Sequence, residues 1–126
     1  WLGWYAAAQG YSGFLRWAFD SWTQEPLRDT SYVTWPAGDC FLVYPGARSS
    51  VRFERLREGV AAYEKVRLVR KALSAREDPA ARQALADLEA ALAGFRYATV
   101  QKTPEEVTVK AARKALISAT QAAWPE

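Results

Sequence analysis

The sequence contains no histidine, asparagine or methionine, and its single cysteine is Cys40. Without histidine, neither a Ser-His-Asp triad nor a Cys-His pair can form, and the usual ligand sets of zinc are excluded. One cysteine cannot form an internal disulfide, and a chain without asparagine has no N-glycosylation sequon. These absences leave carboxylates, tyrosine, lysine and arginine for any catalysis. They predict no cofactor and no metal, and Cys40 itself, in an apolar run, is predicted to be a small core residue.

Long hydrophobic runs are also missing. No apolar run approaches the roughly 18 to 20 residues that span a bilayer, so no membrane partner is predicted. The 126 residues suffice for one modest domain, and a chain that opens on Trp1 is expected to be a segment of a longer product. The formal net charge is only +3, and basic residues stand beside acidic ones, as in RFERLREG. This pattern favours a solvated helix face over a nucleic-acid patch.

Aromatic residues concentrate in the first part of the chain. Residues 1–45 hold twelve of the seventeen aromatics but only six charged residues, whereas residues 46–126 hold the other twenty-five charges. The first part is therefore expected to be buried or adhesive, and the second to be a solvated helical coat.

Local signals predict four helices and two strands. Gly10 is typical of a helix end, Asp78-Pro79 of a helix start, and Thr103 to Glu106 of a capping box. Two apolar runs, FLRWAF and CFLVY, indicate buried strands. The predicted helices are 1–9, from Ser49 or Ser50 to about 75, 79–94 and 103–124, and the predicted strands are 14–19 and 40–44.

This element order predicts an α/β fold. Parallel strands need cover on both faces, and three amphipathic helices cannot readily supply all of it. Strand, loop, strand, loop and long helix is typical of the last strand-helix units of a (β/α)8 barrel, here followed by C-terminal helices that make the chain helix-rich. In such a barrel the site lies on the loops after the strands.

Aromatic and polar residues follow both predicted strands. Trp17, Asp20 and Trp22 lie at the end of the first strand, and Tyr44 and Arg48 lie at the end of the second. Indole faces suit the apolar C–H surface of sugar rings, and carboxylates or arginine suit the hydroxyl rim. We therefore expect a substrate-binding site for a carbohydrate here. The plainer alternative is that the tryptophans are core residues and Asp20 caps a turn.

A long connection without helical periodicity joins the two strands, from Asp20 to Asp39. Compact domains rarely carry so long a loop unless it binds something. Asp29, Trp35 and Asp39 are candidates for ligand contact. Asp39 is the strongest of these, because the preceding Gly38 lets the backbone approach a ligand closely.

Three stretches, GFLRWAFDSW, WPAGDCFLVYPG and SSVRFERLREGVAAYEKVRLV, resemble the C-terminal region of glycoside hydrolase family 123 proteins, also known as domain of unknown function 4091. The resemblance covers residue 1 to about residue 73. It implies a retaining hexosaminidase-type barrel in which the 2-acetamido oxygen of the substrate attacks the anomeric carbon, an Asp orients it, and an adjacent Glu is the general acid. Such substrate-assisted enzymes are exceptions to the two-carboxylate scheme.

The sequence departs from this family pattern at the acids. Asp followed by Glu occurs nowhere, and the neighbouring acids are Glu77-Asp78 and Glu105-Glu106 at predicted helix starts. The resemblance therefore implies that the acid pair lies upstream, and we predict no catalytic residue and no activity for residues 1–126 alone. The predicted parts are 1–76, which would pack against the remainder of its own barrel, and a helical extension, 77–126. Two alternatives stay open, a non-catalytic carbohydrate-binding or structural protein and a helical interaction module.

Overall fold

Helices make up most of the architecture. The computed structural model describes residues 1–31, 35–100 and 102–125. Within these ranges five helices follow one another: α1 (Leu2–Gln9), α2 (Val51–Ser74), α3 (Pro79–Leu92), α4 (Tyr97–Val100) and α5 (Glu105–Ala123). The helix-rich part of the predicted fold is therefore confirmed.

Capping residues explain the end of α1 and the starts of α2 and α3. Gly10 ends α1 in the left-handed conformation with φ 71°, as predicted. Ser50 caps α2, since its Oγ accepts the amide hydrogen of Phe53 at 3.1 Å. The capping box predicted at Thr103 is wrong. The residue that caps α5 is Pro104, without a side-chain hydrogen bond, so Thr103 lies one position outside the cap.

The two predicted strands are not formed. Residues 14–19 have no strand assignment, and residues 40–44 contribute only to isolated bridges, Asp20 with Phe41 and Tyr44 with Arg48. The bridge that joins the two segments, Asp20 with Phe41, is antiparallel, whereas the barrel prediction implies parallel strands. Where the two segments meet, the backbone exchanges only two hydrogen bonds, Ser21 N to Cys40 O at 3.1 Å and Leu42 N to Phe19 O at 2.7 Å. The apolar run CFLVY therefore forms a segment with isolated bridges and no continuous β-ladder.

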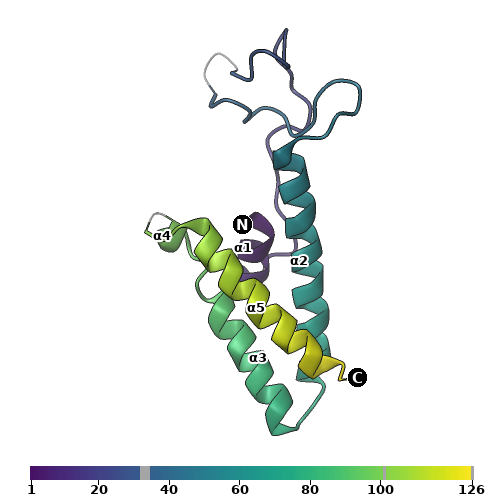
Figure 1. Ribbon diagram of the computed structural model, residues 1–126, viewed down its shortest axis with the longest axis vertical. Coiled ribbons are helices and arrows are strands. Elements are labelled where there is room, and N and C mark those ends of the chain that lie inside the picture. Colours follow the sequence, from purple (N-terminus) through teal and green to yellow (C-terminus); the bar gives the residue numbers. More distant parts are fainter. Residues whose placement is uncertain (32–34, 101, 126) are drawn as a thin grey trace. The chain divides into compact units, whose positions relative to one another are not determined.

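The chain divides into two units. We call Trp1–Gly13 with Gly59–Glu126 the helical unit, and Phe14–Glu58 the loop unit. In the helical unit, α3 and α5 lie side by side (Figure 1). Its core joins Trp4 of α1 to Val66 and Leu73 of α2, Leu88 of α3 and Leu116 of α5. In the part of the chain that the structure describes, no helix has the length and apolar character to cross a membrane.

The buried face of α2 does not include every apolar residue of the helix. Val66, Val69 and Leu73 are buried, but Val60 is 51% exposed. The small residues Gly59 and Ala62 are buried in that part of the helix. It is Gly3 that allows α1 to approach this part of α2, because a Cβ atom on Gly3 would overlap the Gly59 backbone.

Asp78 makes a testable contribution to the helical unit. Its Oδ1 accepts the Ala81 amide hydrogen at 2.9 Å, and its Oδ2 pairs with Arg76 Nε at 2.8 Å. We expect Asp78→Ala to lower the melting temperature by a few degrees, because α3 loses its N-terminal cap. Asp78→Asn is the matched control, since an amide oxygen also caps a helix. Equal melting temperatures for Asp78→Ala and the wild type would contradict this role.

The same contact should depend on pH. The Ala81 amide and the Arg76 guanidinium hold the pKa of the Asp78 carboxyl below its ordinary value of 3.8. A depressed pKa in the folded state gives a stabilisation that is complete above the unfolded pKa and is lost as pH falls through the folded value. The difference in melting temperature between wild type and Asp78→Ala should therefore be constant above about pH 5 and shrink as the pH falls below about 4.

Candidate functional site

In the loop unit, side chains donate most of the hydrogen bonds that a neighbouring strand would supply in a sheet. Each carbonyl from Asp39 to Val43 accepts a hydrogen bond from outside this five-residue segment. The donors, in order along the segment, are Arg16 Nη2, the Ser21 amide, Arg52 Nε, Ser50 Oγ and Trp22 Nε1. Buried carbonyls must be paired, and these donors satisfy the segment without a neighbouring strand. We call residues 39–43 the clamped segment.

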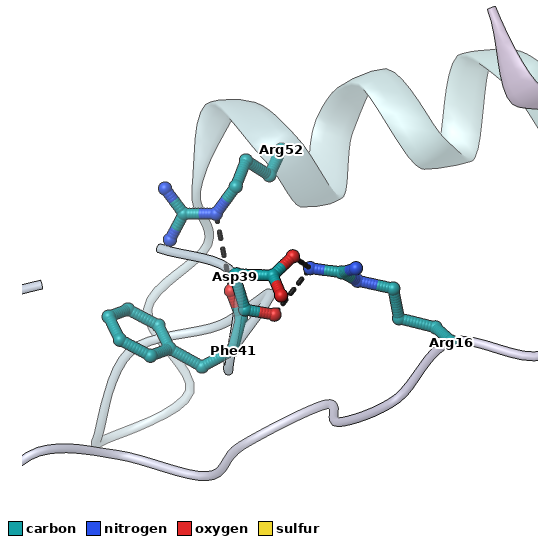
Figure 2. Close-up of polar contacts among 4 residues, drawn as sticks. All are labelled: Arg16, Asp39, Phe41 and Arg52. Carbon is teal, nitrogen blue, oxygen red and sulfur yellow. Dashed lines mark hydrogen bonds and ion pairs between the residues drawn. The ribbon is translucent and has the colours of Figure 1, made fainter. Parts of the chain in front are cut away.

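Two arginines approach the clamped segment from different elements. Arg16, in the extended stretch before it, binds both the carbonyl and the carboxylate of Asp39, the latter at 2.7 Å. Arg52, in the first turn of α2, donates to the Phe41 carbonyl at 3.2 Å (Figure 2). The Asp39 carboxylate, which we predicted to contact substrate, is therefore half-buried in an ion pair.

Three further predicted site residues lie at the far end of the clamped segment. The Trp22 indole donates to Val43 O at 2.7 Å. Tyr44 packs its ring edge-on against Phe41 with centroids 5.3 Å apart, and its amide donates to Arg48 O at 2.8 Å. The structure thus brings Trp22, Tyr44 and Arg48 to one place, and the Arg48 side chain is exposed there.

Trp17 forms an exposed aromatic platform with Trp35. Their rings are stacked, with centroids 6.2 Å apart and an interplanar angle of 23°. Trp17 is 65% exposed and Trp35 48% exposed, so large indole surfaces face solvent in the loop unit. Asp20 is exposed as well, and among the described residues no hydrogen-bond donor reaches its carboxylate. It therefore has acceptor capacity available for a ligand hydroxyl.

The long loop returns on itself through local hydrogen bonds. Gly38 N donates to Thr30 O at 2.7 Å, and Thr23 Oγ1 donates to Asp29 O at 2.7 Å. The Asp29 carboxylate accepts the Ser31 amide hydrogen at 2.8 Å, a turn contact that gives it a structural role. Residues 32–34 of this loop lie outside the described ranges.

Sequence reasoning missed Arg16, Ser50 and Arg52 as organisers of this region. A usable signal was present in the Ser-x-Arg spacing of residues 50 and 52, which places both donors at the start of one helix. Ser50 and Arg52 hold neighbouring carbonyls, those of Leu42 and Phe41. Cys40 is buried and free, which confirms the prediction of a core residue.

The acidic residues at the start of α2 serve the helix surface. Glu54 pairs with Arg57 at 2.9 Å, and Glu58 pairs with Arg55 at 2.8 Å, as expected from their spacing. Across the described ranges no group of three or more His, Cys, Asp or Glu residues could hold a metal ion. In the loop unit, the exposed indole faces offer apolar surface on which a ring can stack, and the exposed Asp20 carboxylate can accept hydrogen bonds.

Comparison with protein families decides the relationship. The model of the glycoside hydrolase 123 catalytic domain matches residues 1–69. The chain belongs to glycoside hydrolase family 123. The match includes the whole loop unit and most of α2 and ends before α3 begins. No match was found among curated proteins.

Proposed function

We propose that this family 123 chain supplies part of the substrate-binding surface of a glycoside hydrolase acting on N-acetylhexosaminides. The observation that carries the proposal is the exposed, stacked Trp17–Trp35 pair in a region matched by the catalytic-domain model. A sugar ring can stack on an indole face. We propose that the exposed Asp20 carboxylate accepts a sugar hydroxyl and that Trp22, Asp39, Tyr44 and Arg48 complete the surface.

The proposed reaction is substrate-assisted retaining hydrolysis. Residues 1–126 contain no Asp followed by Glu. We therefore propose that another part of the catalytic domain supplies the acid pair, and that this chain binds and orients the sugar. The same absence favours a second candidate, a non-catalytic carbohydrate-binding member of the family. Release of nitrophenol from nitrophenyl N-acetylhexosaminides by the full-length protein separates the two, because only an enzyme would release it.

Exposed apolar residues support the proposed barrel relationship. Leu15 is 98% exposed, and Phe14 and Phe19 are also exposed. Exposed large apolar side chains so close together in the sequence are typical of a segment that packs against more protein. We propose that residues 1–76 belong to a barrel whose remainder covers this stretch, and that residues 77–126 are a helical extension.

Trp17 provides the test of the sugar surface. We expect Trp17→Ala to weaken binding of N-acetylglucosamine or N-acetylgalactosamine about tenfold, because about 1.5 kcal/mol of stacking is lost. Isothermal titration calorimetry of the full chain would measure the dissociation constant. Trp124→Ala is the matched control, since Trp124 is an exposed tryptophan of the helical unit. Equal affinities for Trp17→Ala and wild type would count against the proposal.

A further inference from the structure

Arg52 combines a contact that fixes the backbone at Phe41 with a buried donor that does not stabilise the fold. Its Nη2 is buried and has no hydrogen-bond partner among the described residues. A buried donor without a partner destabilises the folded state. Arg52 Nε nevertheless donates to Phe41 O at 3.2 Å, and Cζ lies 5.1 Å from the centroid of the Phe41 ring.

The Arg52 guanidinium packs against Gly38, where no side chain blocks it. A Cβ atom built on Gly38 would lie 2.6 Å from Arg52 Nη1, and Gly38 has φ 76°, which disfavours other residues. Gly38 and Phe41 flank Asp39 and Cys40, and the Asp39 carboxylate binds Arg16. Arg52 is therefore linked to Arg16 through the clamped segment, and Arg16 is the residue before Trp17 of the aromatic platform.

We infer that Arg52 is a positioning residue for the sugar-binding surface, holding the turn from Gly38 to Phe41 so that Asp39 and Arg16 fix the backbone beside Trp17. The inference rests on the proposed function. Arg52 touches no reacting group itself, and it acts through the clamped segment. Ser50 assists by holding Leu42 O and capping α2 with the same hydroxyl.

Arg52→Met tests this role. Methionine keeps apolar contact with Phe41 and removes both the Phe41 hydrogen bond and the unpaired buried donor. We expect the Leu42 amide, which donates to Phe19 O, to exchange its hydrogen about tenfold faster. We also expect the dissociation constant for N-acetylgalactosamine to rise about tenfold, while the melting temperature is not lowered.

Two further variants of the full chain make the result specific. Arg57→Met removes the same charge from an exposed site on α2 and should change none of the three quantities. Arg52→Lys keeps the charge but lacks the planar guanidinium. Its Leu42 amide exchange rate and its dissociation constant for N-acetylgalactosamine should therefore match those of Arg52→Met. It also provides a folded variant if Arg52→Met fails to fold.

The measurements separate the possible failures. Unchanged Leu42 exchange in both Arg52 variants would overturn the inference whatever the sugar result. Faster exchange with an unchanged dissociation constant would overturn the positioning role while leaving the proposed function intact. If the wild-type chain binds neither N-acetylglucosamine nor N-acetylgalactosamine, the proposed function fails, and the role of Arg52 in sugar binding fails with it. The exchange rate of the Leu42 amide then still decides whether Arg52 holds the clamped segment.

Discussion

Gly3→Ala should destabilise the helical unit by about 3 kcal/mol, near the upper end of the usual range for overpacking. A Cβ atom on Gly3 would lie 2.0 Å from the Gly59 carbonyl oxygen and 2.3 Å from its carbonyl carbon. Both are backbone atoms, so no side-chain rotation can relieve the overlap. Alanine favours a helix over glycine by about 1 kcal/mol, which is too little to offset the separation of α1 from α2.

Gly59→Ala is the matched control for that prediction. A Cβ atom on Gly59 would meet Gly3 N at 3.4 Å and Gly3 Cα at 3.6 Å, which are ordinary contacts. We expect this variant to be as stable as the wild type or more stable by up to about 1 kcal/mol, since the site is inside a helix. Urea denaturation would measure both variants. Equal stability of Gly3→Ala and Gly59→Ala would contradict the close approach of the two helices.

Phe95→Ala should destabilise the helical unit by about 3 to 5 kcal/mol. Phe95 is 0% exposed, and it stacks on Trp4 with ring centroids 5.9 Å apart and also contacts Trp1 at 5.7 Å. Its carbonyl accepts a hydrogen bond from Gln9 Nε2 at 3.0 Å, which ties it to the end of α1. Truncation to alanine leaves a cavity among these aromatic rings.

Two comparison variants sharpen the Phe95 prediction. Phe95→Leu keeps most of the buried volume and should lose less stability than Phe95→Ala. Tyr97→Ala removes an aromatic ring that is 72% exposed and should change the free energy of unfolding by less than about 0.5 kcal/mol. Urea denaturation again gives the values. A Phe95→Ala loss as small as that of Tyr97→Ala would contradict the described core.

Helices were predictable from the sequence because their signals are local. Gly10, Ser50 and Asp78 each act on amides or carbonyls within a few residues, so their effect can be recognised without knowing the fold. The face that a helix buries depends on distant neighbours. Gly59 is buried because Gly3, far away in sequence, lies against its backbone, and no local pattern distinguishes Gly59 from an exposed glycine.

The prediction of two strands was wrong for a related reason. CFLVY has the composition of a buried strand, and Phe41 and Leu42 are indeed buried. Strand pairing, however, depends on what satisfies the backbone, and here the donors are the side chains of Arg16, Arg52, Ser50 and Trp22. Sequence periodicity reports burial and cannot report which donor reaches a carbonyl.

The candidate site stays a prediction. Trp17, singled out in the sequence as a sugar-stacking residue, is 65% exposed, which leaves its indole face available to a ligand. The proposed roles of Trp22 and Asp39 now include a structural part, because the Trp22 N–H and the Asp39 carboxylate are already bonded within the loop unit. Residue types suited to sugars are also suited to holding backbone, and only the contacts distinguish the two uses.

The most direct test follows the six indole N–H signals of the ¹⁵N-labelled full chain during titration with N-acetylgalactosamine, with glucose as a control. The account predicts that the Trp17 and Trp35 signals shift in a saturable way. The signals of Trp1 and Trp4, which lie against Phe95, should stay in place. Saturable shifts confined to other tryptophans, or no shift at all, would contradict a sugar-binding surface on the loop unit.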